Sequence, residues 1–463
     1  MKRTLSLALL SLATLVCPAI AEEALTASPD VAAAVTEAAM VVSDTPAAVA
    51  DSGNTAWLLV CSALVMLMTP GLAFFYAGMV SRKNVVSTLL QNYVALAVIG
   101  VLWVVVGYSL AFSQGNGFIG GLGYTMLNGL TNVINPTTGI PEYAFVAFQM
   151  MFAIITPALF TGAIAERVHF RAWISILALW SLCVYSPVAH WVWGVGGWLF
   201  DKGALDFAGG LVVHLTAGIA ALIAAIMFGK RHNPSESAKP NDISMIMLGA
   251  ALLWFGWFGF NAGSALTSGA LASHAFLTTF IGAATAFIAW MATDWIRLGK
   301  PSATGAAIGL VVGLVVITPA AGYVSITSAI LMTAIAGVVC NLVAVAVKHI
   351  IKVDDALDVF ACHGVGGLLG AIMTGLFAEK AINGAVVNQG FFIDGSTTLL
   401  MANLTGVGAV ALYTAVVTFL LIKIVGLFTP IRVSKTEEQV GLDTSVHGET
   451  SRYHAKGYET ANK

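Results

Sequence analysis

The stretch DFAGGLVVHLTAG, residues 206–218, carries one histidine, His214, within a run of leucine, valine, alanine and glycine. Its composition is that of a helix crossing a lipid bilayer, where about 20 mostly apolar residues span the hydrocarbon core. An ionisable group at that depth is costly, and such groups usually face the inside of a helical bundle. The stretch therefore predicts a membrane-spanning helix with a buried histidine, and it raises the question of what that imidazole does.

The composition of the whole chain has the same character. Of 463 residues, 58% are hydrophobic and 10% are charged, and the mean hydropathy is +0.88. A soluble globular protein carries about 25% charged residues, so this balance indicates a membrane protein. The net charge is −2, and the chain has no basic stripe, zinc-finger spacing or GxxxxGK[ST] motif, so nothing indicates a nucleic-acid partner.

Charged or turn-rich breaks divide the chain into apolar segments of membrane-spanning length. We expect an all-α integral membrane protein with eleven transmembrane helices. The expected spans are 55–79, 88–112, 142–163, 171–190, 207–229, 243–263, 274–296, 303–318, 323–349, 359–378 and 397–427.

The lysines and arginines of the loops predict the orientation of these spans, because such residues collect on the cytoplasmic side. With the N-terminus outside, the outer loops hold only Lys202 and Lys380. The inner loops then hold Arg82, Lys83, Arg167, Arg171, Lys230, Arg231, Lys239, Arg297, Lys300, Lys348 and Lys352. We therefore expect an external N-terminus and a cytoplasmic C-terminus.

The regions outside the spans suggest four parts. Residues 1–21 have a basic start, an apolar core and a small-x-small end, which predicts a signal peptide cleaved after Ala21. Residues 22–54 have the composition of a flexible exported linker. Residues 55–430 form the predicted membrane domain, and residues 431–463 form a charged tail. The five cysteines include no CxxC pair, so neither a disulfide framework nor a zinc site is indicated.

A repeat is visible around two histidines. His214 and His363 lie deep within predicted spans, and each follows an aspartate by eight residues, Asp206 and Asp355. The two helices are the fifth and the tenth spans, five places apart in chain order, so they run in opposite directions, with both histidines near mid-depth. The pattern predicts an inverted repeat of five spans plus five, followed by a final helix, which is an architecture typical of transporters.

Three interpretations of the histidines remain open at this point. A buried histidine that bonds a backbone carbonyl is the commonest outcome for a single residue of this kind. Two symmetric intramembrane histidines favour a substrate or proton path instead. A metal site would need more ligands than these two imidazoles, so no metal or other cofactor is expected.

Aromatic residues gather towards the outer ends of several spans. They are Phe148 and Phe152 in the third span, Trp191, Trp193 and Trp198 near the fourth, and Trp254, Trp257 and Phe260, followed by Ser264, in the sixth. An interfacial aromatic belt with core packing explains most of them. An aromatic cage for a small cation is the alternative, since a cation gains about 0.5–2 kcal/mol over a ring face.

At these residues the chain resembles the ammonium transporter family, which includes the Rh proteins, over nearly all of residues 55–450. The segments that carry the resemblance are TPGLAFFYAGMVSRKNV, AFQMMFA, FTGAIAERVHF, VAHWVWG, GALDFAGGLVVHLTAG, GWFGFNAGSA, VDDALDVFACHGVGG and EEQVGLDTSVHGE. Met150 and Met151 depart from the family, which more often has smaller residues at these positions.

The resemblance implies a homotrimer with one pore in each subunit, and a role for each matched residue. Phe148, Trp193 and Ser264 match the outer site that recruits ammonium, and Phe152 and Phe260 match a gate of stacked rings. His214 and His363 match a pair of histidines lining the pore, with or without a proton relay. Asp206 matches a family aspartate with a structural or electrostatic role, and helix capping alone would also explain it. We assign Asp355 the same kind of role, because its spacing is the same.

The function implied is uptake of NH4+, which is deprotonated and conducted as NH3, with or without its proton, into the cytoplasm. We therefore expect a transporter, not an enzyme, in a bacterial inner membrane. The tail resembles those that dock a PII-type regulatory protein, with a disordered tail as the plain alternative. Two other functions remain open: an ammonium sensor, for which we expect a larger attached signalling domain, and a channel for another small neutral molecule such as methylamine or CO2.

Overall fold

The structure, a computed structural model, describes residues 48–232 and 239–451, and the residues from Ala50 onward form one structural unit. The predicted signal peptide, most of the predicted linker, Cys17 and the last residues of the tail lie outside the described residues. The other four cysteines are free thiols.

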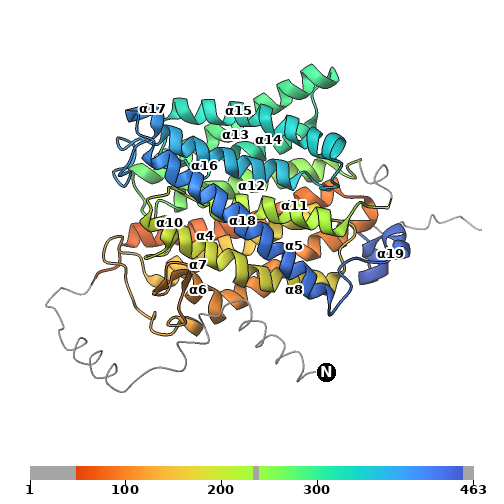
Figure 1. Ribbon diagram of the computed structural model, residues 1–463, viewed down its shortest axis with the longest axis horizontal. Helices are drawn as coiled ribbons and strands as arrows, with labels where there is room; N and C mark the ends of the chain where they lie inside the picture. The colour runs from red at the N-terminus through yellow and green to blue at the C-terminus, as the bar shows by residue number, and fades with distance from the viewer. Residues whose placement is uncertain (1–47, 233–238, 452–463) are drawn as a thin grey trace, which may run out of the picture. The chain divides into compact units, whose positions relative to one another are not determined.

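Helices dominate the first half of the unit, and Figure 1 shows their arrangement. The elements are α4 (Ser52–Met79), η1 (Arg82–Asn84), α5 (Val85–Leu102), η2 (Trp103–Gly107), α6 (Tyr108–Phe112), β1 (Gly115–Asn116), β2 (Ile119–Gly120), η3 (Thr125–Leu127), α7 (Glu142–Leu159), η4 (Phe160–Ile164), α8 (Phe170–Trp180), η5 (Ser181–Tyr185), α9 (Ser186–Trp193), α10 (Trp198–Asp201), η6 (Gly210–Leu215) and α11 (Thr216–Phe228).

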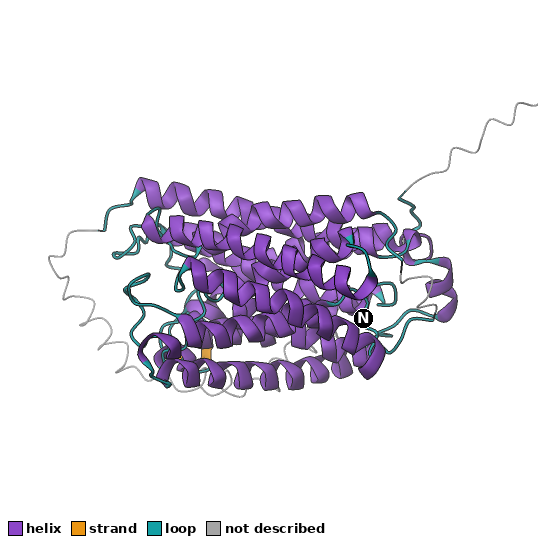
Figure 2. Ribbon diagram, turned by 90° about the horizontal axis from the view of Figure 1, so that it is seen from above, coloured by secondary structure: helices purple, strands orange, loops and turns teal. Residues whose placement is uncertain are grey.

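The second half contains α12 (Ile243–Gly263), α13 (Ala270–Leu298), α14 (Ala303–Ile317), α15 (Ile326–Ala346), η7 (Val347–Ile351), η8 (Phe360–Val365), α16 (Gly366–Phe377), α17 (Phe391–Asp394), α18 (Thr398–Gly426), α19 (Lys435–Val440) and η9 (Asp443–His447). The long helices of the unit run roughly side by side (Figure 2). The all-α expectation holds except for the antiparallel hairpin of β1 and β2, which are two residues each.

Ten helices of the described ranges are long and apolar enough to cross a membrane, and they coincide with ten of the eleven expected spans. The remaining expected span, 303–318, is α14, which has 15 residues. At about 1.5 Å per residue, a helix of this length falls short of the roughly 30 Å hydrocarbon core. Its residues from Gly305 to Ile317 are all buried, so α14 lies inside the bundle. The count of eleven spans, their orientation and the inverted repeat remain predictions.

Polar residues in the loops determine where several of the long helices begin. The Asp51 side chain accepts a hydrogen bond from the Asn54 backbone N–H at 2.7 Å, and Asp242 accepts one from Met245 at 3.1 Å. Ser302 does the same for Gly305 at 3.0 Å, at the start of α14. Such caps satisfy backbone donors that have no partner within the helix, which is especially important where lipid excludes water.

Glycines allow the two histidine-bearing helices to pack with their backbones almost in contact. A Cβ atom on Gly218 of α11 would lie 1.9 Å from the backbone nitrogen of Gly364 in η8. A Cβ atom on Gly367 would lie 2.8 Å from the backbone nitrogen of Leu215. Small residues have this effect at helix contacts in membranes, where close packing replaces the hydrophobic drive. The two π-helical segments η6 and η8 therefore lie directly against each other.

The segment after α18 packs against loops between the spans. The His169 backbone N–H donates to the Ile431 carbonyl at 2.9 Å, and the Val433 N–H donates to the Arg167 carbonyl at 3.1 Å. The Asp443 carboxylate accepts hydrogen bonds from the backbone N–H groups of Val86, at 3.0 Å, and Ser87, at 2.8 Å. Up to residue 451, the predicted tail is thus attached to the first turn of α5.

Candidate functional site

A cavity of about 480 Å³, which we call the outer cavity, is lined by residues of α7, the end of α9 and the end of α12. Among its lining residues are Gln149, Phe152, Trp193, Asp206 and Ser264. Four of these five are residues singled out in the sequence, and the structure brings them together from segments far apart in the chain. An enclosure of aromatic rings with a few polar groups suits a small polar or cationic solute.

Two of the predicted residues are held by hydrogen bonds at this cavity. The Trp193 indole donates to the Asp206 backbone carbonyl at 2.9 Å. The Ser264 hydroxyl donates to the Phe260 carbonyl at 2.9 Å. Because that hydroxyl uses its only proton in this way, its oxygen lone pairs remain available to accept a hydrogen bond from a solute.

Phe148 does not line the outer cavity, unlike Trp193 and Ser264, with which it was expected to form one site. Its ring is fully buried, and its centroid is 4.9 Å from that of Phe152. It packs against Gly263 of α12, whose Cβ, if present, would lie 2.7 Å from the ring. Within the described residues Phe148 is not among those lining the outer cavity, whereas the next residue, Gln149, is.

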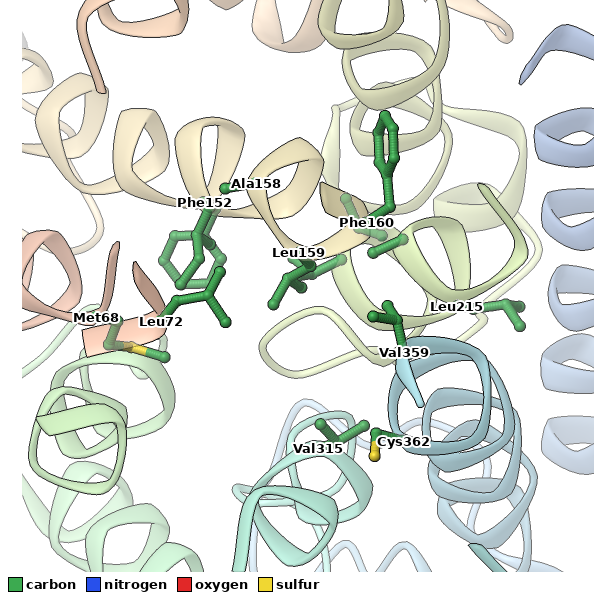
Figure 3. Close-up of a cluster of buried hydrophobic side chains, with 14 of the residues drawn as sticks. Met68, Leu72, Phe152, Ala158, Leu159, Phe160, Leu215, Val315, Val359 and Cys362 are labelled. Carbon is green, nitrogen blue, oxygen red and sulfur yellow. The ribbon is translucent and has the colours of Figure 1, made fainter. Parts of the chain in front are cut away.

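The two phenylalanines predicted to form a gate stack on each other. The ring centroids of Phe152 and Phe260 are 4.2 Å apart, with their planes 34° apart. Phe152 lines the outer cavity, and Phe260 lines a much smaller cavity on its far side. The stacked rings therefore separate the two spaces. Figure 3 shows Phe152 beside Met68 and Leu72, which line the smaller cavity and make its wall apolar.

The smaller cavity, of about 10 Å³, has both histidines in its wall, and we call it the narrow cavity. The Nδ1 atoms of His214 and His363 are 3.2 Å apart, a hydrogen-bond distance in which one ring donates and the other accepts. Within the described residues the Nε2 atom of His214 is buried and has no hydrogen-bond partner. A space of this size holds about one water-sized molecule.

Trp257 belongs to the same site, although it was only one of several aromatics in the sequence. Its ring stacks on His214, with centroids 5.4 Å apart and planes 24° apart. Its indole donates to the Thr318 hydroxyl at 2.9 Å, which fixes the plane of the ring. The available signal was its position three residues before Phe260, which places both rings on one face of α12.

The two aspartates lie at the starts of the histidine-bearing helices. The Asp206 carboxylate accepts hydrogen bonds from four backbone N–H groups, those of Gly209, Gly210, Leu211 and Val212, at 2.6–3.2 Å. Asp355 accepts one from Phe360 at 2.7 Å, and its other oxygen is buried without a partner among the described residues. Burial, and secondarily the charge of Asp358, raise the pKa of Asp355 to about 6.

A further cavity, of about 390 Å³, is lined by residues of the loops predicted to be cytoplasmic, and we call it the inner cavity. At its edge the Arg231 guanidinium bridges two carboxylates, Glu166 at 2.8 Å and Asp354 at 2.9 Å. Burial alone would raise the pKa of Glu166, but the charge of Arg231 and the hydrogen bonds from Ser81 and Arg231 hold it below its usual value. These ion pairs tie three loops together where the chain leaves the bundle.

The described residues contain no group of three or more His, Cys, Asp or Glu side chains placed to hold a metal ion. The site thus consists of a large cavity, an aromatic stack, a narrow apolar space with paired imidazoles, and a second large cavity. Within a bundle of long apolar helices, such a series is the arrangement expected of a multi-pass membrane protein that passes a small solute.

Comparison with known proteins identifies the group to which the chain belongs. Residues 56–452 match the profile of the Ammonium Transporter Family. An ammonium transporter of Bacillus subtilis is 46% identical over 400 residues, covering 86% of this chain and 98% of that protein. Ammonium transporter Amt1 of Archaeoglobus fulgidus is 45% identical over 403 residues, covering 87% and 99%. The chain therefore belongs to the ammonium transporter family.

Solved structures agree with this assignment. The crystal structure of Mep2 from Saccharomyces cerevisiae matches with a TM-score of 0.78 at 36% identity, covering 86% of this chain and 93% of that one. A structure described as a sensor Amt protein matches with a TM-score of 0.78 at 29% identity, covering 85% and 98%. The resemblance noted in the sequence is confirmed, and with it the membrane-helical fold.

Proposed function

We propose that this protein transports ammonium, taking up NH4+ at the outer cavity and conducting it as NH3 through the narrow cavity. The observation that carries the proposal is the series of spaces: an aromatic outer cavity, the Phe152–Phe260 stack, and a cavity of about 10 Å³ with paired histidines in its wall. A space of that size rejects hydrated ions and most organic solutes, but it accepts a molecule as small as ammonia.

Recruitment of the cation is assigned to Trp193, Ser264 and the Phe148–Phe152 pair. The ring of Trp193 and the Ser264 oxygen replace part of the ammonium hydration shell at the outer cavity. Phe148 contributes through the ring of Phe152, against which it packs. A charge this close to apolar walls is held weakly enough to be released, as a transport site requires.

The charge is then shed, because carrying it through the apolar passage is expensive. At the stack of Phe152 and Phe260, NH4+ transfers its proton to the Nε2 atom of His214, which is unpaired among the described residues, and neutral NH3 enters the narrow cavity. There, the paired imidazoles of His214 and His363 offer one donor and one acceptor in sequence. We assign the proton to the same pair, so that net transport is of NH3 together with H+. Asp206 and Asp355 act by holding the starts of the two helices, as their backbone hydrogen bonds suggest.

The proposal also covers the oligomeric state, the membrane location and the regulatory partner. The subunits form a homotrimer with one pore each, in a bacterial inner membrane, with the N-terminus outside and the C-terminus in the cytoplasm. The tail and neighbouring loops are the docking face for a PII-type regulatory protein. The family assignment and the loop charges support this setting. A sensor, or a channel for methylamine or CO2, is not favoured by any feature of the cavities.

The decisive experiment is transport by the purified protein in liposomes. We expect an inward current on a solid-supported membrane after an ammonium pulse, together with uptake of radiolabelled methylammonium that ammonium competes away. Uptake without current would assign transport to NH3 alone and would overturn the proton relay. Absence of both signals from a folded protein would overturn ammonium transport itself.

The histidine pair makes a sharper prediction. His214→Asp places an ionisable carboxylate in the narrow cavity, where it can hold a bare cation, so we expect potassium currents that the native protein lacks. His274→Gln is the matched control, because His274 bonds the Val324 carbonyl away from this cavity. An His214→Asp protein that transports with unchanged selectivity would contradict the role of the pair.

A further inference from the structure

Gln149 is a polar residue in the outer cavity that no part of the proposed mechanism uses. It lies on α7 four residues after Phe145 and three before Phe152, and all three line the outer cavity. This spacing places them on one face of the helix. Gln149 therefore lies on the cavity side of α7, between Phe145 and Phe152 along the helix, and Trp193 and Ser264 line the same cavity.

The amide oxygen of Gln149 lacks a hydrogen-bond donor within the described residues. Its exposed fraction is only 8%, and within the described residues its Oε1 atom is buried without a hydrogen-bond partner. Buried acceptors are almost always paired, and leaving one unpaired destabilises the protein. Gln149 lines the outer cavity, and a turn about its terminal amide torsion brings the Oε1 atom to face that cavity. The missing donor is then most simply one that arrives with the solute.

We propose that the Oε1 atom of Gln149 accepts a hydrogen bond from ammonium in the outer cavity, and that Gln149 is a specificity residue for the transported cation. The inference rests on the proposed function and extends it. Ammonium has four N–H donors, and the aromatic faces satisfy charge but not hydrogen bonding. Ser264 and Gln149 supply two oxygen acceptors in this cavity without adding a negative charge.

The neutrality of the amide matters for release. A carboxylate at this position would bind the cation more strongly and would also oppose the loss of its positive charge. A glutamine oxygen directs an N–H group while leaving deprotonation possible. It also favours ammonium over methylammonium, which has one N–H fewer and needs room for a methyl group.

The test compares variants of two buried glutamines. Gln149→Met removes the acceptor at nearly constant volume. Gln91→Met is the matched control, because the Oε1 atom of Gln91 is likewise buried without a partner among the described residues, but Gln91 is not a lining residue of the outer cavity. Ammonium-driven currents and methylammonium competition are measured in liposomes, and thermal unfolding in detergent verifies that each protein is folded.

For Gln149→Met we expect the KM for ammonium to rise about tenfold, the loss of one hydrogen bond to a charged group, with the maximal rate changed less than about twofold. The preference for ammonium over methylammonium should become smaller. Gln149→Glu should instead lower both the KM for ammonium and the maximal rate. Gln91→Met should keep the native KM and selectivity.

The outcomes separate the two levels of the proposal. A native protein that carries ammonium, with a folded Gln149→Met variant of unchanged KM and selectivity, would overturn this inference and leave the proposed function intact. An equal KM shift in Gln91→Met would also overturn it, since the effect would then be structural. A folded native protein without ammonium transport would overturn both. If Gln149→Met does not fold, Gln149→Glu provides the test. A lower KM together with a lower maximal rate is expected only if residue 149 contacts the cation, and an unchanged KM and rate would overturn the inference.

Discussion

Two buried histidines of this protein have the same side chain but different hydrogen-bond partners. His190 and His214 are both buried histidines, but the two ring nitrogens of His190 lie 2.9 and 2.8 Å from the carbonyls of Ala111 and Asn116. His190 is thus the structural kind of buried histidine. The Nδ1 atom of His214 meets another imidazole, and its Nε2 atom has no partner among the described residues. The contrast distinguishes a histidine bonded to carbonyls from one paired with another imidazole, and the role of His214 in a substrate or proton path stays a prediction.

Asp355 supplies a pH-dependent prediction. Its pKa is raised from an ordinary value of 3.8 to about 6, so the folded protein keeps the proton longer than the unfolded chain does. The stability associated with this proton is fully present below about pH 4 and is lost as the pH rises through 6. The loss amounts to about 3 kcal/mol. We expect Asp355→Asn, which cannot ionise, to gain stability relative to the native protein across this window.

Apparent unfolding midpoints of the two proteins in detergent, measured from pH 4.5 to 7.5, test this. The midpoints should nearly coincide at the acid end, and the variant should exceed the native protein at the neutral end. A difference that does not change with pH would mean that Asp355 is not protonated in the way its burial indicates.

Among the contacts between elements, that of α11 with η8 leaves the least room for an added side-chain atom. Because a Cβ on Gly218 would lie 1.9 Å from the Gly364 nitrogen, Gly218→Ala must separate two backbones, not only move a side chain. We expect a lower unfolding temperature, by an amount corresponding to roughly 1–3 kcal/mol or more, and a loss of ammonium uptake as the His214–His363 hydrogen bond lengthens.

Gly408 on α18 is the matched control for this change. Nothing in the described part of the chain lies within 4 Å of a Cβ built at Gly408, so Gly408→Ala should leave both the unfolding temperature and uptake near native values. Native uptake and stability in Gly218→Ala would show that the contact between the two helices is looser than the structure has it.

At the scale of the whole molecule, the C-terminal segment is linked to the inner cavity by a chain of hydrogen bonds. The Leu442 N–H donates to the Asn84 side-chain oxygen at 2.8 Å, and the amide of Asn84 donates to Glu166 at 3.0 Å. Glu166 pairs with Arg231, which also holds Asp354. Two hydrogen bonds therefore connect Leu442 of the tail to Glu166, which takes part in the ion pairs at the edge of the inner cavity.

Asp443→Ala should loosen this attachment. The substitution removes the acceptor for the Val86 and Ser87 backbone N–H groups, and with it a negative charge at the first turn of α5, where such a charge is favourable. We expect trypsin to cleave after Lys435 several times faster than in the native protein, as followed by mass spectrometry. Asp394→Ala, which changes an exposed residue at the end of α17, serves as the control. Equal cleavage rates in all three proteins would contradict the attachment.

The sequence by itself determined the membrane class, the approximate positions of ten long apolar helices, and the candidate residues of the site. These are local properties, because the thickness of the bilayer sets the length of an apolar run, and backbone hydrogen bonding requires that run to be helical. Composition reports apolarity and does not distinguish lipid from protein as the surrounding medium, so it remains a prediction that the short α14 is an eleventh span.

Only the tertiary structure decided which side chains meet. His214 and His363 are 149 residues apart, and their contact depends on a glycine-mediated crossing that no local pattern specifies. Gln149 lines the outer cavity and Phe148 does not, although the sequence pointed to Phe148. The physical reason is that an almost wholly apolar helix has no polar face from which its rotation can be predicted. That rotation is set by how its neighbours pack, and it decides which residues reach the path.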